Sequence, residues 1–163
     1  IHGDNQQETE LDWLAGFLDG EGSFMLQRRR HRSRGCHITP EMHLSNTHKP
    51  SIDRASAILK RQQIGHHIQM INSKRKRGWS NQWSLRIAGM KRMSLVVALL
   101  RGRSFTKAEQ IELIRQFISY RMSRPQSEPY TDIEWSVRQK IQASNHRGIL
   151  RDFTDDTRPA SAV

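Results

Sequence analysis

Two acidic residues, Asp19 and Glu21, follow directly on the apolar stretch Leu14–Leu18. Gly20 stands between them and Gly22 comes next, so a helix that carries the apolar stretch is expected to end here. The carbonyl end of a helix is the negative end of its dipole, and a carboxylate placed there gains from a bound cation. Carboxylate oxygens are ligands that Mg²⁺ prefers. The pattern therefore indicates either a divalent-cation site at Glu21 or a pair of solvated acids beside a glycine cap.

The composition is strongly basic, with 27 lysines and arginines against 16 acidic residues and a formal net charge of +11. Such a chain attracts polyanions, and double-stranded DNA or another nucleic acid is the expected partner. A run of basic residues is often only a solvated loop. Two runs at the tips of successive predicted hairpins favour a phosphate-contacting surface instead. They consist of Arg28, Arg29, Arg30, Arg32 and Arg34, and of Lys74, Arg75, Lys76 and Arg77.

Helix-start signals and apolar periodicity predict an alternation of helices and hairpins. A threonine followed three residues later by an acid marks helix starts at Thr9, Thr106 and Thr131, because such a pair satisfies two backbone amides. The predicted order is αββαββα with extra C-terminal helices, an α+β domain with one four-stranded antiparallel sheet. The strands are expected over 23–30, 37–45, 67–73 and 81–87, and the helices over 9–19, 50–65, 90–100, 106–122 and 131–145.

The length of 163 residues fits one folded domain over 9–147, with a polar extension over 1–8 and a flexible tail over 148–163. The N-terminus lacks the apolar segment of a secretory signal. No run approaches the ~18 apolar residues that span a bilayer, so no membrane partner is expected. The single cysteine, Cys36, suits a reducing interior. The expected location is intracellular, in a prokaryotic cytoplasm or an organelle.

Other kinds of site fit the sequence less well. The eight histidines and Cys36 do not show the short, fixed ligand spacings of a structural zinc site. Neither a phosphate-binding glycine loop nor the strand-turn-helix motif of a serine hydrolase is present. No small-molecule substrate is therefore expected.

The segment from Leu14 to Phe24 reads Leu-Ala-Gly-Phe-Leu-Asp-Gly-Glu-Gly-Ser-Phe and resembles the signature of the LAGLIDADG homing endonuclease family. The predicted element order extends the resemblance over about 9–122. The resemblance implies a nuclease, a metal-dependent hydrolase of phosphodiester bonds that cuts both strands of a long pseudo-palindromic DNA site and leaves 3′ overhangs. It also implies intron homing. Mg²⁺ is the expected cofactor, and Mn²⁺ is expected to support cleavage as well.

One copy of the motif implies the homodimeric type of this family. Gly16 and Gly20 are four residues apart, so they share one helix face and leave no side chain to hold a second helix away. Trp13 and Asp19 are expected to join them in the dimer interface. Packing of two such helices brings their C-terminal ends together, with one Glu21 from each subunit beside a scissile phosphate.

The resemblance assigns further roles in catalysis. Glu21, with Gly20 beside it, is implied as the metal ligand, and a glutamate where many family members carry aspartate is expected to preserve the chemistry with an altered metal preference. Asn46 matches the position of a polar residue that orients the attacking water, although an asparagine there also suits a helix cap. Lys107 resembles the pocket lysine that stabilises charge on the phosphate. An ordinary first-turn lysine is the alternative, and Lys49 is a third candidate.

Base reading is expected from one face of the sheet, since a two-stranded ribbon fits the major groove. Alternate residues of the two hairpins share this face. They are Met25, Gln27, Arg29, Thr39, Glu41, His43, Gln69, Gln82, Ser84 and Arg86.

Two other functions remain on the same fold. One is an RNA-binding intron maturase, and the other is a DNA-binding regulator that does not cleave. A carboxylate at Glu21 favours cleavage, because a pure binding protein has no need of an acid near phosphates. An intein is disfavoured because the sequence lacks splicing termini, which leaves an intron-encoded or free-standing gene.

Overall fold

The computed structural model describes residues 2–31, 35–71 and 80–145, and within them it has five helices and four strands. The helices are α1 (His2–Glu21), α2 (Lys49–Arg61), α3 (Met90–Leu100), α4 (Ala108–Met122) and α5 (Asp132–Asn145), and the strands are β1 (Gly22–His31), β2 (Gly35–Asn46), β3 (His67–Ile71) and β4 (Gln82–Ala88). The predicted α+β class and element order are confirmed. Six predicted DNA-contacting residues lie outside the described residues, as does the predicted tail over 148–163. They are Arg32, Arg34, Lys74, Arg75, Lys76 and Arg77.

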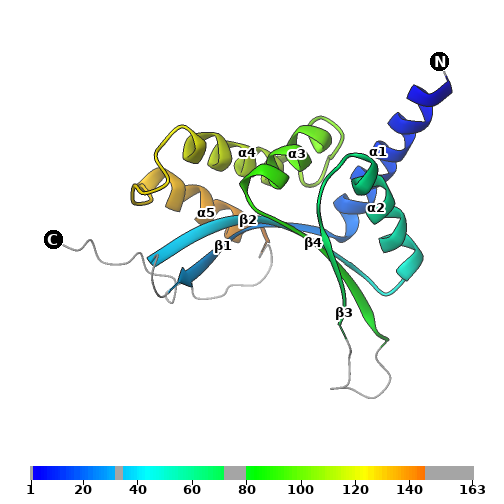
Figure 1. Cartoon of the computed structure of the whole chain (residues 1–163), viewed down its shortest axis with the longest axis horizontal. Coiled ribbons are helices and arrows are strands. Elements are labelled where there is room, and N and C mark those ends of the chain that lie inside the picture. The colour runs from blue at the N-terminus through cyan, green and yellow to red at the C-terminus, as the bar shows by residue number, and fades with distance from the viewer. Residues whose placement is uncertain (1, 32–34, 72–79, 146–163) are drawn as a thin grey trace.

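The four strands form one antiparallel sheet in the order β1-β2-β4-β3 (Figure 1). Alternation of side chains along each strand gives the sheet two unlike faces. One face is apolar and carries Phe24, Met42, Leu44, Leu85 and Ile87, all fully buried. The other face carries the polar residues that alternate with them.

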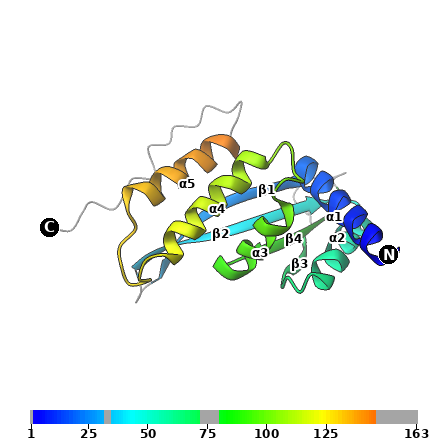
Figure 2. The same cartoon turned by 90° about the horizontal axis from the view of Figure 1, so that it is seen from above.

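The helices cover the apolar face. Figure 2 shows α3, α4 and α5 lying over the strands. Ile52, Ile58 and Leu59 of α2 are buried in the same core as Phe117 of α4. None of the described helices is long and apolar enough to cross a membrane.

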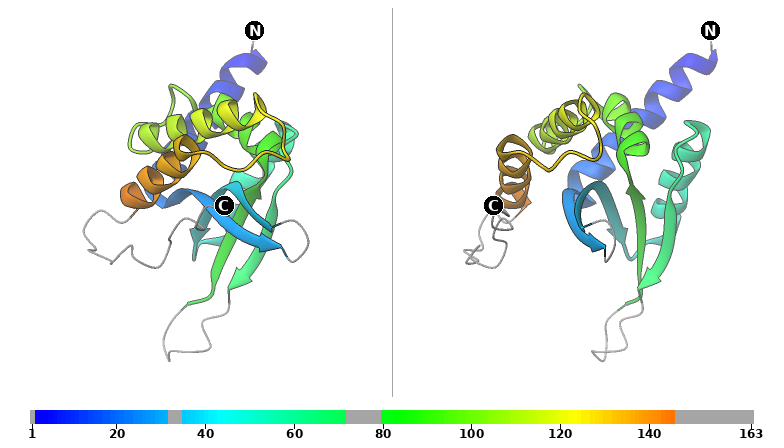
Figure 3. Two further views of the ribbon diagram at one scale, coloured as in Figure 1. Left: turned by 90° about the vertical axis from the view of Figure 1, so that its left-hand side faces the viewer. Right: turned by 60° about the vertical axis from the view of Figure 1, so that its left-hand side comes forward.

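Helix α1 begins earlier than predicted, at His2 instead of Thr9. The Thr9 hydroxyl does not cap a helix; it donates to the carbonyl of Asn5 one turn back, at 2.9 Å. Ion pairs hold this first part of α1 to later segments, with Glu8 2.7 Å from Arg103 and Glu10 2.7 Å from Arg61. The N-terminal turns nevertheless project beyond the rest of the molecule (Figure 3).

Helix α2 ends at Arg61, four residues before its predicted end at residue 65. Gln63 adopts the left-handed conformation, with φ of 57°. Its amide donates to the Lys60 carbonyl at 2.9 Å, and the amide of Ile64 donates to the Leu59 carbonyl at 2.9 Å. This is the Schellman pattern, with a glutamine where glycine is usual.

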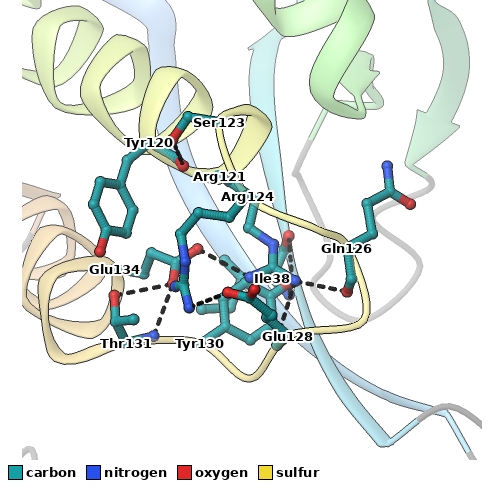
Figure 4. Close-up of polar contacts among 10 residues, drawn as sticks. All are labelled: Ile38, Tyr120, Arg121, Ser123, Arg124, Gln126, Glu128, Tyr130, Thr131 and Glu134. Atoms are coloured by element: carbon teal, nitrogen blue, oxygen red, sulfur yellow. Dashed lines mark hydrogen bonds and ion pairs between the residues drawn. The ribbon is translucent and has the colours of Figure 1, made fainter.

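A buried polar cluster fixes the connection between α4 and α5 (Figure 4). Glu134 is fully buried and accepts from the Thr131 amide at 2.7 Å, so the helix start predicted at Thr131 is confirmed. Arg121 lies 3.4 Å from Glu134 and donates to the carbonyls of Gln126 at 2.7 Å and Glu128 at 2.9 Å. One guanidinium thus joins α5 to two backbone carbonyls of the connection.

Candidate functional site

The C-terminal half of α1 presents a face on which two glycines stand beside aromatic side chains. Gly16 and Gly20 are exposed, and a Cβ added at either would meet nothing within 4 Å. Trp13 and Phe17 flank the glycines on the same helix face, with their rings stacked 5.1 Å apart. This glycine face, made of Trp13, Gly16, Phe17 and Gly20, is open to a second helix on the side where the chain itself places nothing against the glycines.

Glu21 is the last residue of α1 and is exposed. Within the described part of the chain, no hydrogen bond or ion pair engages its carboxylate. The last carbonyls of a helix, here including that of Gly20, also lack intrahelical partners. The end of α1 therefore concentrates negative charge at one exposed point.

The Asp19 carboxylate makes several contacts within its own chain. Its carboxylate accepts a hydrogen bond from the Ser104 hydroxyl, another from the Phe105 amide at 2.8 Å and a third from the Lys107 amide at 3.2 Å. Burial raises the pKa of Asp19, but these hydrogen bonds outweigh burial and leave its pKa below the ordinary value. Asp19 caps the start of α4 within its own chain, and its place in a dimer interface stays a prediction.

The helix start predicted at Thr106 is wrong, because Asp19 caps α4 in place of Thr106. Helix α4 begins at Ala108, and Lys107 at its N-cap makes no side-chain cap hydrogen bond. The carboxylate of Asp19 accepts the amides of Phe105 and Lys107 instead. The predicted pocket lysine, Lys107, is half-buried and is fixed through its backbone beside the end of α1.

The other predicted pocket residues make local contacts. The side-chain oxygen of Asn46 accepts the His48 amide at 2.8 Å and forms a turn before α2. The N-cap of α2 is His48, which has no side-chain cap hydrogen bond, so Asn46 does not cap this helix. Lys49 pairs with Asp53 at 2.6 Å and lies 5.1 Å from the Trp83 ring. Neither side chain contacts the end of α1 among the interactions of the described residues.

The polar face of the sheet gathers the predicted base-reading residues. In the strand register Gln27 lies opposite Thr39, His43 opposite Arg86, and Gln69 opposite Ser84. The predicted grouping on one face is confirmed. It comprises Met25, Gln27, Arg29, Thr39, Glu41, His43, Gln69, Gln82, Ser84 and Arg86. His37 and His67 share this face and escaped the sequence analysis, although the same alternation continued by two residues would have included them.

Arg28 and Arg30 alternate to the opposite face from Arg29. The guanidinium of Arg28 donates to the Cys36 sulfur at 3.1 Å and lies 5.6 Å from the Trp135 ring of α5. The structure therefore places only Arg29 of these three on the polar sheet face.

Glu41 also differs from its predicted role as an exposed base-reading group. It is 1% exposed, and Arg29, Arg86 and His43 surround its carboxylate. Its oxygens accept hydrogen bonds from protein groups and are not offered at the surface. At this point of the sheet the exposed groups are the two arginines. The side chain of Arg29 is 44% exposed and that of Arg86 is 35% exposed.

Comparison with known proteins identifies solved structures that share this fold. No protein-family model matches the sequence, and no curated protein matches it either. Solved structures match closely in fold. The archaeal intron-encoded homing endonuclease I-Vdi141I, complexed with DNA, has a TM-score of 0.67 at 14% identity, over 91% of this chain and 92% of that one. The homing endonuclease I-CvuI, in complex with the I-CreI target, has a TM-score of 0.60 at 15% identity, over 86% and 98%.

The LAGLIDADG homing endonuclease I-GzeII, in complex with its DNA target, has a TM-score of 0.58 at 17% identity. This chain has the LAGLIDADG homing endonuclease fold. The match covers 82% of this chain but 43% of the I-GzeII chain. The LAGLIDADG fold thus occurs in chains of about this length and in chains more than twice as long as the matched part.

In this LAGLIDADG fold, the end of α1 has oxygen donors that suit a hard divalent cation. They are the exposed carboxylate of Glu21 and the terminal carbonyls of α1, including that of Gly20. Within residues 2–31, 35–71 and 80–145, no group of three or more histidine, cysteine or acidic residues gathers to hold a metal. An ion at Glu21 would therefore complete its coordination with ligands from outside these side chains, such as phosphate oxygens and water.

Proposed function

We propose that this chain is a site-specific DNA endonuclease that hydrolyses phosphodiester bonds in both strands of a duplex with a divalent metal ion. The observation that carries the proposal is Glu21. It stands exposed at the end of α1, next to the glycine face, and has no partner among residues 2–31, 35–71 and 80–145. The solved examples of this fold I-Vdi141I and I-GzeII are complexed with DNA.

The proposed active form is a homodimer packed through the glycine face. One chain supplies one such carboxylate, whereas cutting two strands at neighbouring phosphates calls for two. Because Gly16 and Gly20 leave open space beside α1, a second α1 can approach closely there. The half-length match to I-GzeII supports this reading, since two copies of this chain would equal one longer chain.

The polar sheet face is proposed to lie in the major groove. It combines arginines with glutamines, which read guanine and adenine by paired hydrogen bonds. A net charge of +11 supports phosphate contacts around it, and such contacts make binding strongly salt-dependent. A twofold dimer reads a nearly palindromic site, because each subunit presents the same face.

In the proposed reaction, a bound Mg²⁺ or Mn²⁺ would supply the Lewis acidity that activates a water and stabilises the leaving oxygen. The Glu21 carboxylate and the Gly20 carbonyl would hold it. Lys107, held beside the end of α1 by Asp19, would place positive charge near the phosphate. Cleavage with 3′ overhangs, intron homing and an intracellular location complete the proposal.

A cleavage assay on a library of duplex sites with Mg²⁺ tests this function. We expect the native chain to cut one site in both strands. Glu21→Gln should bind that site but cut it at least roughly 100-fold more slowly, because a metal ligand is lost. Glu112→Gln is the matched control. The hydrogen bond from Arg115 lowers the pKa of Glu112 to about 2, so the control removes an ionised carboxylate from α4.

Three outcomes are informative. If the native chain binds one site tightly and does not cut it, the protein is a regulator and the enzyme proposal fails. If Glu21→Gln cuts as fast as the native chain, the metal ligand lies elsewhere. A preference for structured RNA over every duplex would favour the maturase alternative.

A further inference from the structure

We infer that Glu41 determines DNA sequence preference by holding Arg86 and Arg29 in fixed orientations that read guanine. Glu41 itself contacts no base in this scheme; it is a positioning residue. The inference rests on the proposed function, because it assumes that the polar sheet face lies on a duplex.

The geometry around Glu41 is that of a fully occupied carboxylate. Arg86 donates twice, from Nε to Oε2 at 3.0 Å and from Nη2 to Oε1 at 2.5 Å. Arg29 donates from Nη2 to Oε1 at 2.6 Å, and His43 Nε2 lies 3.0 Å from Oε2. The three partners come from all three strands that meet at this point, β1, β2 and β4, so the cluster forms only when the sheet is assembled.

The bidentate contact decides which edge of Arg86 faces outward. A guanidinium has one donor edge made of Nε and Nη2 and another made of Nη1 and Nη2. Glu41 occupies the first edge, which leaves Nη1 and the second Nη2 proton for a ligand. Guanine presents two acceptors, O6 and N7, in the major groove, and a two-donor guanidinium edge matches that pair. Arg86 is therefore preset for guanine.

Charge explains why an acid is tolerated on a surface that faces a polyanion. Glu41 is 1% exposed, and the two arginines above it leave the group with a net positive charge. The carboxylate also offsets the repulsion between guanidiniums whose Nη2 atoms both lie within 2.6 Å of its Oε1. Without it, both arginines would repel each other and sample more rotamers, and a base would have to order them at an entropic cost.

The expected signature is a loss of discrimination without a loss of general affinity. Glu41→Gln removes one negative charge, so nonspecific attraction to DNA should be kept or strengthened. The preference for guanine at the base pair under Arg86 should fall about tenfold, within the range that one bidentate contact provides. In a symmetric dimer the same base pair is affected in both half-sites.

The test measures binding of full-length native protein and variants to the duplex that the native protein selects, with each base pair replaced in turn. Glu41→Gln and Arg86→Lys should relax the same guanine position while binding to nonspecific duplex persists. Arg86→Lys keeps the charge and loses the fork of donors. Glu112→Gln, with an ion-paired glutamate on α4 and the same change of charge, should leave the profile unchanged.

Several results separate failure of this inference from failure of the proposed function. If the native protein selects no duplex sequence, the proposed function fails and takes the inference with it. If the native protein selects a site and Glu41→Gln selects the same site with unchanged base preference, the proposed role of Glu41 fails and the proposed function stands. If Glu41→Gln does not fold, the NMR signal of the Arg86 Nε–H group in the native protein decides: a rigid, hydrogen-bonded group supports the inference, and a mobile one overturns it.

Discussion

Replacement of Asp19 by asparagine would remove the charge that caps α4 while leaving the shape of the side chain almost unchanged. Asp19 accepts from Ser104, from the Phe105 amide at 2.8 Å and from the Lys107 amide at 3.2 Å. An asparagine has one acceptor oxygen, and its NH₂ group would face at least one of these donors. The start of α4 and the end of α1 would therefore lose part of the contact that joins them.

The expected loss of stability follows from two comparisons. Removal of a helix cap costs about 0.5–2 kcal/mol. A hydrogen bond to a charged group contributes about 1.5–3 kcal/mol, and at least one of the three becomes unfavourable. We expect a decrease of about 2 kcal/mol in the free energy of unfolding at pH 7, equivalent to about 4–8 °C in Tm for a domain of this size.

The stability difference between native protein and Asp19→Asn should depend on pH. The folded pKa of Asp19 lies below the ordinary value of 3.8, because its hydrogen bonds outweigh the effect of burial. A lowered carboxyl pKa contributes stability above the unfolded pKa and loses it as pH falls through the folded pKa. The gap between native protein and Asp19→Asn should be full at pH 7 and should shrink below about pH 4.

Thermal unfolding followed by circular dichroism between pH 2 and pH 7 measures this gap. Asp12→Asn is the control, because Asp12 lies on the same helix with its side chain 65% exposed and pairs with Arg103 at 2.7 Å. An exposed pair of this kind should contribute less than about 1 kcal/mol. Equal melting of native protein and Asp19→Asn at pH 7, or a gap that stays constant down to pH 2, would refute the capping role.

Two further substitutions test the buried cluster and the glycine face. Glu134→Gln should lower the free energy of unfolding in urea by about 3–5 kcal/mol, because it leaves the buried guanidinium of Arg121 without its counter-charge; a loss under about 1 kcal/mol would contradict this. Gly16→Leu should convert the proposed dimer to a folded monomer in sedimentation, because a Cβ added at this position meets nothing within 4 Å in its own chain while a leucine would block a second helix; a variant that still dimerises would place the interface elsewhere.

The sheet could be predicted from the sequence because its signal is local. Trp83, Leu85 and Ile87 alternate with polar residues, and a period of two fixes which side chains share a face before any partner strand is known. The same rule extended over β1 and β2 placed Arg29 and His43 on the polar face, as the register has them.

Two of the three predicted helix starts could not be predicted correctly from local sequence. The threonine and acid pattern occurs at Thr9, Thr106 and Thr131, and only Thr131 begins a helix in the way the pattern predicts. At Thr106 the capping carboxylate comes from Asp19, about 85 residues earlier in the chain. A tertiary contact therefore determines which side chain caps α4. The local motif shows only which neighbouring groups are able to cap the helix.

The role of Glu41 was hidden for a related reason. Strand alternation placed it on the polar face, but its partners Arg29 and Arg86 are 12 and 45 residues away along the chain. Only the register brings them together. A glutamate among arginines on one predicted face could have suggested an ion pair, and the sequence did not reveal that the carboxylate would be buried beneath them.

Four acidic residues of the described chain differ in how their carboxylates are engaged, and the difference bears on function. Asp19, Glu41 and Glu134 each have their carboxylates engaged by several donors of the same chain. Glu21 is exposed at the carbonyl end of α1, where the helix dipole disfavours a negative charge and no donor among the described residues offsets it. A sequence selected for stability alone would place a lysine or arginine there. An acid held against the local electrostatics, beside a glycine face and in a strongly basic protein, supports the proposal that a cation binds there together with DNA.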